Sequence, residues 1–364
     1  MNILQVCAYA APYEGNFMKS LYALDQQLTK QGHRVIYAFC QYAKEVEWIR
    51  KLKKRRKVYF LPQRYARINP STYFKLRRIL VKEQIKIVHS HFELYDLPLS
   101  IVSPKSCQII WHLHDTLEDN YYKENKLRKR LYQLQYKSFS KRAILCSVSE
   151  KHMRFAISLG FDSKNALFVP NGVDFSRLHE SNTSKCEYDF LIFAWDYLRK
   201  GADIAIKAAK QLYEESYRFK IGFVGNETLW DNEEIQSVMQ EPWFVKQNFE
   251  EDISDLYNST KCFLHLSRSE GCSYALIEAS YFGLPIISSD IDENMFLNHL
   301  PTIKMIRSES IIDTFNAMKN IIEQDFLLDV SDVLDTKNTI RKYYSLDAWV
   351  KNILSVYRSY CGLK

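Results

Sequence analysis

Residues 262–288 read CFLHLSRSEGCSYALIEASYFGLPIIS and form one complete strand–helix–strand pattern. Cys262–Leu266 and Pro285–Ser288 are short apolar runs typical of buried strands, and Ser273–Phe282 between them has a helical pattern. The apolar runs do not alternate with polar residues, which is typical of strands in a parallel sheet covered on both faces. The stretch therefore predicts an α/β protein with a parallel sheet.

The same alternation of apolar runs and helical patterns extends along most of the chain. The first series of predicted strands is Ile3–Tyr9, Val35–Phe39, Val58–Leu61, Ile85–Val88, Gln108–Leu113, Ile144–Val148 and Ala166–Val169. A second series starts with Phe190–Ala194 and Ile221–Val224 and continues into the stretch quoted above. Two such series predict two doubly wound, Rossmann-like α/β domains. We expect them over residues 1–175 and 176–342, with a further helix in residues 343–364.

Composition is that of a globular protein: 46% of the 364 residues are apolar and 26% are charged. No apolar run approaches the ~18–20 residues of a membrane span, and the N-terminus has the pattern of a first strand rather than of a signal peptide. The net charge of +7 is a modest bias towards anionic partners. Eight scattered cysteines without a C-x-x-C pair predict reduced thiols in a cytoplasmic protein, not a metal cage.

Two glutamates flank the start of the helix in the opening stretch. Glu270 stands at the tip of the strand, and Glu278 lies on the helix about one and a half turns in. Ligands of open α/β sheets bind beyond the carboxyl ends of strands, where a helix N-terminus attracts phosphate. Carboxylates accept several hydrogen bonds and so suit sugar hydroxyls. The structural alternative makes Glu270 a helix-dipole residue and Glu278 an exposed side chain.

Two further turns carry residues suited to phosphate. Arg199 and Lys200 precede Gly201 where a helix is predicted to start, which favours a diphosphate site. Gly15 and Asn16 open the first helix, where a glycine lets the backbone approach a ligand closely. The alternative for each segment is an ordinary turn without a ligand.

Histidines gather at the ends of two predicted strands, in His89-Ser90-His91 and in His112-Leu113-His114-Asp115. Strand alternation directs His112 and His114 to the same face, with His114 nearer the carboxyl end. One interpretation is a zinc site, but the spacing suits parallel strands rather than a chelate, and no acidic or cysteine ligand is evident. The other interpretations are a functional histidine and a structural one.

The order of these motifs resembles that of the family 4 glycosyltransferases, which have the GT-B fold. Glu270–Glu278 matches the E-x7-E motif of the family, and Gly283-Leu284-Pro285-Ile286 follows it as in the family. The other matching segments are Gly15 to Gly32-His33-Arg34-Val35, His89-Ser90-His91, His114-Asp115, Val169-Pro170-Asn171-Gly172-Val173-Asp174 and Lys200-Gly201-Ala202-Asp203. The resemblance covers nearly the whole chain.

The resemblance implies two facing Rossmann-like domains, with a C-terminal helix that crosses back to the first. It implies transfer of a sugar, with retention and without a metal or other cofactor, from a nucleotide-sugar (most commonly a UDP-sugar) to a glycan or lipid-linked glycan. The residues implied to act on the donor sugar are His114 and Glu270, and Glu278 is implied to bind the ribose. The other donor-binding residues implied are Gly15, Asn16, Arg199, Lys200, Gly271, Cys272, Ser273 and Tyr274.

Three positions depart from the family pattern. Asn16 stands where the family usually has a second glycine, and Ser273 replaces the second glycine of its E-G-x-G text. The arginine that usually stands about five residues before Lys200 is missing, so we expect Arg199 to supply the second cation.

Three other function classes are compatible with parts of the sequence. A retaining glycosidase needs two carboxylates ~5–5.5 Å apart across one bond, for which Glu278 is poorly placed behind Glu270. A sugar-nucleotide-binding or lipid-binding scaffold that has lost activity is the second alternative, prompted by Asn16. Nucleic-acid binding is the third, prompted by Arg50–Lys57, but no stacking motif accompanies these charges, so we expect no nucleic-acid partner.

Two cationic stretches in the first domain predict contact with a membrane surface. Arg50–Lys57 holds seven cations in eight residues, and Lys123–Arg142 predicts a helix rich in lysine and arginine. Each cation near an anionic surface is worth about 1 kcal/mol. We expect a cytoplasmic protein held peripherally at the inner face of the membrane; the alternative is a solvated charged face.

Overall fold

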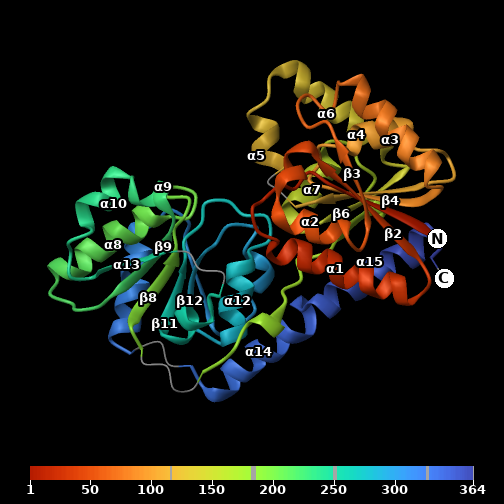
Figure 1. Ribbon diagram of the computed structural model, residues 1–364. Coiled ribbons are helices and arrows are strands. Elements are labelled where there is room, and N and C mark those ends of the chain that lie inside the picture. The colour runs from red at the N-terminus through yellow and green to blue at the C-terminus, as the bar shows by residue number, and fades with distance from the viewer. Residues whose placement is uncertain (115–116, 182–185, 249–251, 325–327, 364) are drawn as a thin grey trace. The chain divides into compact units, whose positions relative to one another are not determined.

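The computed structural model describes residues 1–114, 117–181, 186–248, 252–324 and 328–363. The chain forms two compact units, one from Met1–Gly172 with Leu346–Lys364 and one from Val173–Ser345. Each unit is a parallel sheet with flanking helices (Figure 1). The predicted fold class, two Rossmann-like α/β domains, is confirmed. The divisions at 172/173 and 345/346 lie beside the 175/176 and 342/343 expected from the sequence.

The first unit has a seven-stranded sheet in the order β3-β2-β1-β4-β5-β6-β7. Its strands are β1 (Asn2–Cys7), β2 (Arg34–Cys40), β3 (Lys57–Leu61), β4 (Ile85–His91), β5 (Gln108–Leu113), β6 (Ala143–Ser147) and β7 (Ala166–Phe168). All seven were predicted, but β4 was expected to end at Val88 and runs on to His91. It can do so because His89 and His91 are buried with hydrogen-bond partners, as a central strand requires.

The helices of the first unit include one from the far end of the chain. They are α1 (Gly15–Lys30), α2 (Glu47–Lys53), α3 (Pro70–Lys82), α4 (Asp96–Val102), α5 (Leu117–Tyr122), α6 (Lys126–Phe139), α7 (Glu150–Ser158) and α15 (Leu346–Cys361). Asn125 starts α6 three residues later than predicted, because its side chain accepts a 3.0 Å hydrogen bond from the Arg128 amide. The C-terminal helix α15 packs against α1 (Figure 1), as predicted.

The second unit has a six-stranded sheet in the order β10-β9-β8-β11-β12-β13. Its strands are β8 (Tyr188–Phe193), β9 (Ile221–Gly225), β10 (Phe244–Asn248), β11 (Thr260–His265), β12 (Ile286–Ser289) and β13 (Ile303–Ile306). The sequence missed β10 and β13, the two edge strands. Both carry exposed polar residues, such as Lys304 in β13, so neither forms a continuous apolar run.

Seven helices belong to the described part of the second unit: α8 (Ala202–Glu214), α9 (Glu227–Trp230), α10 (Glu233–Val238), α11 (Ser254–Asn258), α12 (Tyr274–Phe282), α13 (Ile311–Ile322) and α14 (Val330–Tyr344). A single helix was predicted to start near Tyr343. Instead α14 ends at Tyr344 and α15 starts at Leu346, because the intervening Ser345 is extended (φ −74°, ψ 164°).

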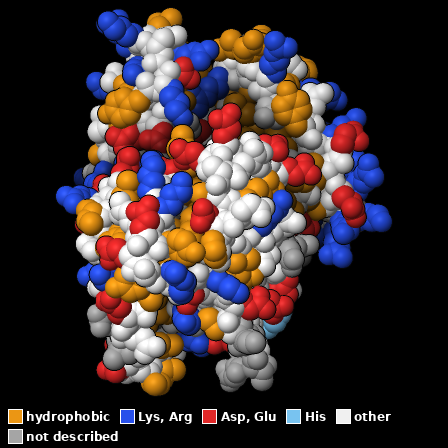
Figure 2. Space-filling view, turned by 90° about the vertical axis from the view of Figure 1, so that its left-hand side faces the viewer, with side chains coloured by type: hydrophobic (Ala, Val, Ile, Leu, Met, Phe, Trp, Pro, Cys, Tyr) orange, Lys and Arg blue, Asp and Glu red, His pale blue; other side chains and the backbone are white. Residues whose placement is uncertain are grey.

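The cysteines, the helices and the surface charges are those of a globular protein. All eight cysteines are free thiols, and seven of them are buried. Among the helices that the structure describes, none combines the length and apolar character that a membrane span requires. On the face shown in Figure 2, basic side chains lie interspersed with acidic ones, which is typical of a solvated surface.

The turn between β8 and α8 depends on a glycine. Gly201 has a φ of +72°, and a Cβ atom there would lie 2.2 Å from the carbonyl oxygen of Leu266. Leu266 directly follows β11, the neighbour of β8 in the sheet. Arg268 and Asp203 join the same two segments through two hydrogen bonds of 2.8 Å. The loops after β8 and β11 are therefore in direct contact.

We expect Gly201→Ala to destabilise the protein more than Gly32→Ala. Gly32 also has a positive φ (+77°) but open space around its Cα, so alanine there should cost about 1–2 kcal/mol of conformational strain alone. The collision with the Leu266 carbonyl should add about 1–3 kcal/mol at Gly201. Denaturant unfolding of both variants measures the difference, and equal midpoints would contradict the close approach.

Candidate functional site

The candidate site lies at the carboxyl ends of β8 and β11 in the second unit. From β8 the chain proceeds to β9 and β10 on one side, and β11 then pairs with β8 on the other side. The boundary between β8 and β11 is thus the switch point of this sheet, the place where α/β proteins bind ligands. Arg199 and Lys200 follow β8, and Glu270 follows β11.

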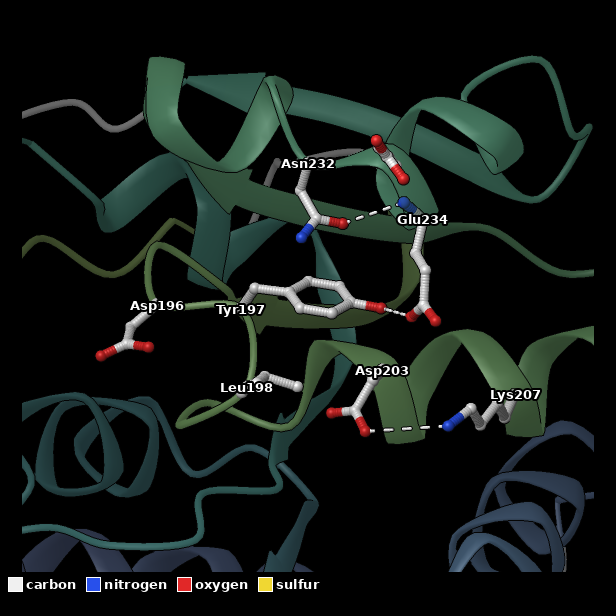
Figure 3. Close-up of a pocket in the computed structure, with 8 residues that line it drawn as sticks. Asp196, Tyr197, Leu198, Asp203, Lys207, Asn232 and Glu234 are labelled. Carbon is white, nitrogen blue, oxygen red and sulfur yellow. Dashed lines mark hydrogen bonds and ion pairs between the residues drawn. The ribbon is translucent and has the colours of Figure 1, made fainter.

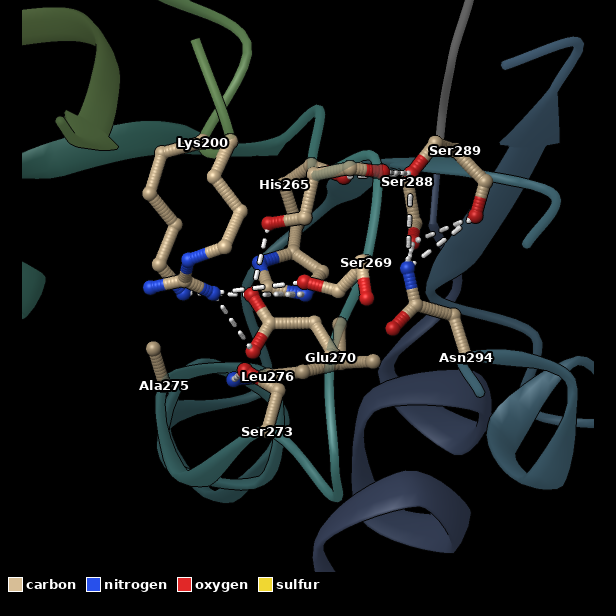
Figure 4. Close-up of polar contacts among 12 residues, drawn as sticks. Lys200, His265, Ser269, Glu270, Ser273, Ala275, Leu276, Ser288, Ser289 and Asn294 are labelled. Carbon is tan, nitrogen blue, oxygen red and sulfur yellow. Dashed lines mark hydrogen bonds and ion pairs between the residues drawn. The ribbon is translucent and has the colours of Figure 1, made fainter. Parts of the chain in front are cut away.

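Glu270 is the centre of a buried polar cluster (Figure 4). The residue is only 7% exposed, and its carboxylate forms an ion pair with the Lys200 ammonium. Ser267 Oγ donates a 2.7 Å hydrogen bond to Oε1, and Arg199 Nη1 lies 3.4 Å from Oε2. His265 Nε2 lies 4.0 Å from Oε1. The structure therefore brings together three of the predicted site residues: Arg199, Lys200 and Glu270.

The protonation states in this cluster follow from burial and neighbouring charge. Burial opposes ionisation of Glu270, but the charges of Lys200 and Arg199 outweigh it and lower the pKa of the carboxyl to about 2. Burial lowers the pKa of His265 to about 4, so its ring is neutral at pH 7. At neutral pH Glu270 is thus a carboxylate held between two cations, Lys200 and Arg199, beside the start of α12, and Asp196 is a second carboxylate on Arg199.

The start of α12 completes this surface. Ser273 is its N-cap, and its Oγ accepts a 3.3 Å hydrogen bond from the Leu276 amide. Cys272 and Ser273 are buried, whereas Gly271 and Tyr274 are partly exposed. A helix N-terminus carries a partial positive charge that attracts anions, and here it lies directly after Glu270 in the chain. The predicted residues Gly271–Tyr274 thus form a turn suited to a phosphate or sugar.

Glu278 lies on α12 with a partner of its own. It is 3% exposed and forms an ion pair with Arg177. The exposed Glu278 of the structural alternative is therefore excluded. Sequence reasoning missed Arg177, because its position beside α12 depends on the path of the segment before β8. The two glutamates have separate cationic partners.

An aromatic side chain covers the cations of the cluster. The Arg199 guanidinium lies 4.6 Å from the centre of the Trp195 ring, and Lys200 Nζ lies 5.4 Å from it. Arg199 also donates a 2.8 Å hydrogen bond to Asp196 through Nε. Since Trp195 is 46% exposed, this edge of the cluster faces solvent. The loop after β8 thus presents Arg199 at an accessible edge, whereas Lys200 lies buried behind it.

A neighbouring pocket of about 630 Å³ has a different character (Figure 3). It is lined by Asp196, Tyr197, Leu198, Asp203, Lys207, Asn232, Glu233 and Glu234. Four of these side chains are carboxylates and one is a lysine, although Asp196 pairs with Arg199 and Asp203 with Arg268. The remaining excess of carboxylates makes this pocket less suited to an anionic ligand than the Lys200 cluster.

The remaining predicted site residues lie in the first unit. Gly15 is the first residue of α1 with a φ of +59°, and Asn16 is partly buried next to it. His114 directly follows β5, and its Nε2 lies 3.0 Å from His91 Nδ1. The Phe17 ring of α1 packs 5.1 Å from the His114 ring, so the start of α1 and the end of β5 are neighbours. Asp115 lies outside the described residues.

We expect acid to remove the stability that Glu270 supplies. Its pKa is lower in the folded protein than the ordinary 4.5, so the stabilisation is complete above that pH and is lost as the pH falls towards 2. The wild type should therefore lose about 3 kcal/mol more than Glu270→Gln over this range. Urea unfolding at several pH values checks this, with the exposed Glu227→Gln as the control. Parallel pH profiles for wild type and Glu270→Gln would contradict it.

Comparisons with known proteins identify the family of the chain. Glycosyltransferase Family 4 matches residues 19–177, and Glycosyl transferases group 1 matches residues 174–296. The gpi3 subunit of phosphatidylinositol N-acetylglucosaminyltransferase from Schizosaccharomyces pombe is 22% identical over 384 residues, which is 96% of this chain and 79% of that protein. The capsular polysaccharide biosynthesis glycosyltransferase CapH from Staphylococcus aureus is 25% identical over 235 residues, which is 62% of this chain and 65% of that protein.

The fold comparison points in the same direction. The crystal structure of Anabaena Alr3699/HepE in complex with UDP superposes with a TM-score of 0.80 at 14% identity, covering 99% of this chain and 100% of that chain. The family resemblance and the fold predicted from the motifs are therefore confirmed. The chain belongs to the family 4 glycosyltransferases and is a transferase of the GT-B fold.

Proposed function

We propose that the protein transfers a sugar, with retention and without a metal, from a UDP-sugar to a glycan or lipid-linked glycan acceptor. The observation that supports this most directly is the Glu270 cluster with Lys200 and Arg199 at the start of α12. In the proposal, the cations and the helix N-terminus bind the diphosphate, Glu278 binds the ribose, and Glu270 and His114 act on the donor sugar.

The charges of the cluster suit the chemistry of a departing nucleoside diphosphate. As the bond to the sugar breaks, negative charge grows on the leaving phosphate, and prearranged positive groups stabilise it most in the transition state. Lys200 is 7% exposed and is already held by Glu270, so little reorganisation is needed when the donor binds. The same cations make Glu270 a permanent carboxylate, which is a good acceptor for sugar hydroxyls.

The names of the relatives and structures guide the choice of substrates. Structures of HepE contain UDP and UDP-glucose, which supports a UDP-sugar as donor. One relative is a subunit of a phosphatidylinositol N-acetylglucosaminyltransferase and another is a capsular polysaccharide glycosyltransferase. Both names support an acceptor that belongs to a lipid-linked or cell-surface glycan. The alternative is a weakly active nucleotide-sugar-binding scaffold, which Asn16 prompts.

A donor screen with two matched variants tests the function. We expect slow hydrolysis of one UDP-sugar by the wild type, among UDP-, GDP- and ADP-sugars. Glu278→Gln should weaken UDP binding about tenfold to a hundredfold, since glutamine has one neutral acceptor oxygen in place of the carboxylate and hydrogen bonds to a charged group are worth about 1.5–3 kcal/mol. Glu270→Gln should reduce kcat and keep UDP affinity near that of the wild type, because Lys200 and Arg199 remain. Calorimetry and steady-state kinetics measure the two quantities.

The outcomes separate the alternatives. UDP binding without turnover of any donor would support the scaffold. Loss of UDP binding in Glu270→Gln together with normal binding in Glu278→Gln would reverse the two assignments. Unfolding midpoints of both variants control for damage to the fold.

We also propose that the first unit attaches the protein to the inner face of an anionic membrane. In the described residues, Arg50, Lys51, Arg56 and Lys57 all have acidic partners, so most of the charge in Arg50–Lys57 is compensated.

Helix α6 supports membrane contact better than Arg50–Lys57 does. Its Leu127, Leu131 and Leu134 are 69%, 55% and 61% exposed on one face. The exposed cations Lys126, Arg130 and Lys137 lie in the adjacent row of the helix. Apolar and cationic rows side by side are typical of an interfacial helix.

We expect the protein to sediment with vesicles that contain phosphatidylglycerol and to be partly released by high salt. Replacing Leu127, Leu131 and Leu134 by serine should leave most of the protein in the supernatant, because the apolar row no longer enters the interface. Serine at the exposed Phe74 and Val81 of α3 is the control and should change little. Equal recovery in the supernatant with and without anionic vesicles would contradict the attachment.

A further inference from the structure

A chain of hydrogen-bonded polar side chains crosses the centre of the first unit. It joins β1, β4, β5 and α15, and all its members except the half-buried His114 are almost fully buried. The successive contacts are His114 Nε2 to His91 Nδ1 (3.0 Å), His91 Nε2 to Gln5 Oε1 (3.0 Å), Gln5 Nε2 to Tyr357 Oη (3.0 Å), Tyr357 Oη to His89 Nδ1 (2.9 Å) and His89 Nε2 to His112 Nδ1 (3.1 Å).

The amide of Gln5 determines which way the protons point on the side of His114. Its Nε2 donates to the Tyr357 hydroxyl, so its Oε1 must accept from His91 Nε2. A neutral His91 with its proton on Nε2 has a lone pair on Nδ1, which can only accept. His114 must therefore carry its proton on Nε2 and donate it to His91.

The hydrogen bonds from Gln5 through Tyr357 and His89 to His112 likewise have a single donor-to-acceptor direction. Tyr357 accepts from Gln5 and donates to His89 Nδ1, so His89 donates from Nε2 to His112 Nδ1. The remaining proton of His112 is then on Nε2. This atom has no hydrogen-bond partner among the described residues, and burial lowers the pKa of the ring to about 3, which the backbone of Val169 offsets only in part. The Val169 amide already donates to the Ser147 carbonyl, so the Val169 group near His112 is its carbonyl. A carbonyl can only accept, so its presence opposes the reverse polarity.

We infer that this chain holds His114 as a neutral imidazole with its proton on Nε2 and makes His91 a positioning residue for transfer. The inference rests on the proposed function, in which His114 acts on the donor sugar. His114 Nδ1 has no hydrogen-bond partner among the described residues. Its lone pair is thus an acceptor for a substrate hydroxyl, and His114 receives a hydrogen bond from the sugar rather than giving one.

Two observations indicate that the histidines of this hydrogen-bonded chain are neutral and do not bind a metal ion. Burial lowers the pKa of His91 and of His114 well below the ordinary value. The nitrogens of His89, His91 and His112 lie within 4.8 Å of one another, which resembles a cation site. However, the Nδ1 lone pair of each ring already accepts a hydrogen bond, from Tyr357, His114 and His89 respectively. A bound ion would have to break these bonds.

Two variants of His91 with nearly the same shape test the inference. Asparagine keeps an oxygen near the place of Nδ1 and can accept from His114, whereas leucine cannot. In the wild type, ¹⁵N-histidine NMR should show His114 neutral at pH 7 with its proton on Nε2; His114→Gln identifies the signal. His91→Leu should give a mixture of tautomers and reduce kcat about tenfold, with the donor KM unchanged. His91→Asn should restore the tautomer and most of kcat.

Each result decides the inference separately from the function. A wild-type His114 that is charged at pH 7 or protonated on Nδ1 overturns the inference, and so does stoichiometric zinc that is lost in His89→Leu. Equal loss of kcat in both His91 variants, at equal unfolding midpoints, also overturns it. If the wild type turns over no donor, the proposed function fails, and the NMR result still shows whether the chain sets the tautomer. Tyr95→Phe removes another buried hydroxyl outside the chain and should leave the His114 signal unchanged.

Discussion

A carboxylate that is taken out of water must be compensated, and the second unit is organised around this requirement at Glu270. Uncompensated, a buried charge would cost several kcal/mol, so the loop after β8 must deliver Lys200 and Arg199 to it. That delivery requires the two loops to touch, which is possible only because Gly201 has no side chain to collide with Leu266. The pair of Asp203 and Arg268 holds the same contact from the other side. The need to compensate the buried charge of Glu270 thus determines how the loops of the candidate site are arranged.

The fold could be predicted from the sequence wherever a strand is covered on both faces. Such strands, like Cys262–Leu266, must be apolar throughout, and they read directly as apolar runs. The edge strands β10 and β13 were not predicted, because they carry exposed polar residues among their apolar ones. The break between α14 and α15 was not predicted for another reason. It depends on the backbone of one residue, Ser345, in a region where the helical pattern continues on both sides.

Individual site residues could be predicted where a motif places them at a strand tip or helix start, as with Glu270 and Lys200. Their partners could not. Arg177 pairs with Glu278 across 101 positions of the sequence, and His265 and Ser267 approach Glu270 through the turn of the chain after β11. Strand alternation suggested a cluster of histidines, but not that Gln5 and Tyr357 would link them, since these come from opposite ends of the chain.

The closing helix has a consequence for how the protein is made. Helix α15 covers α1 and contributes Tyr357 to the interior of the first unit, yet it follows the whole of the second unit in the sequence. The first unit therefore lacks α15 until the whole of the second unit has been synthesised. This differs from the usual order, in which an N-terminal domain can fold before the next one is made. During that interval the face of α1 that α15 later covers is not yet covered by it.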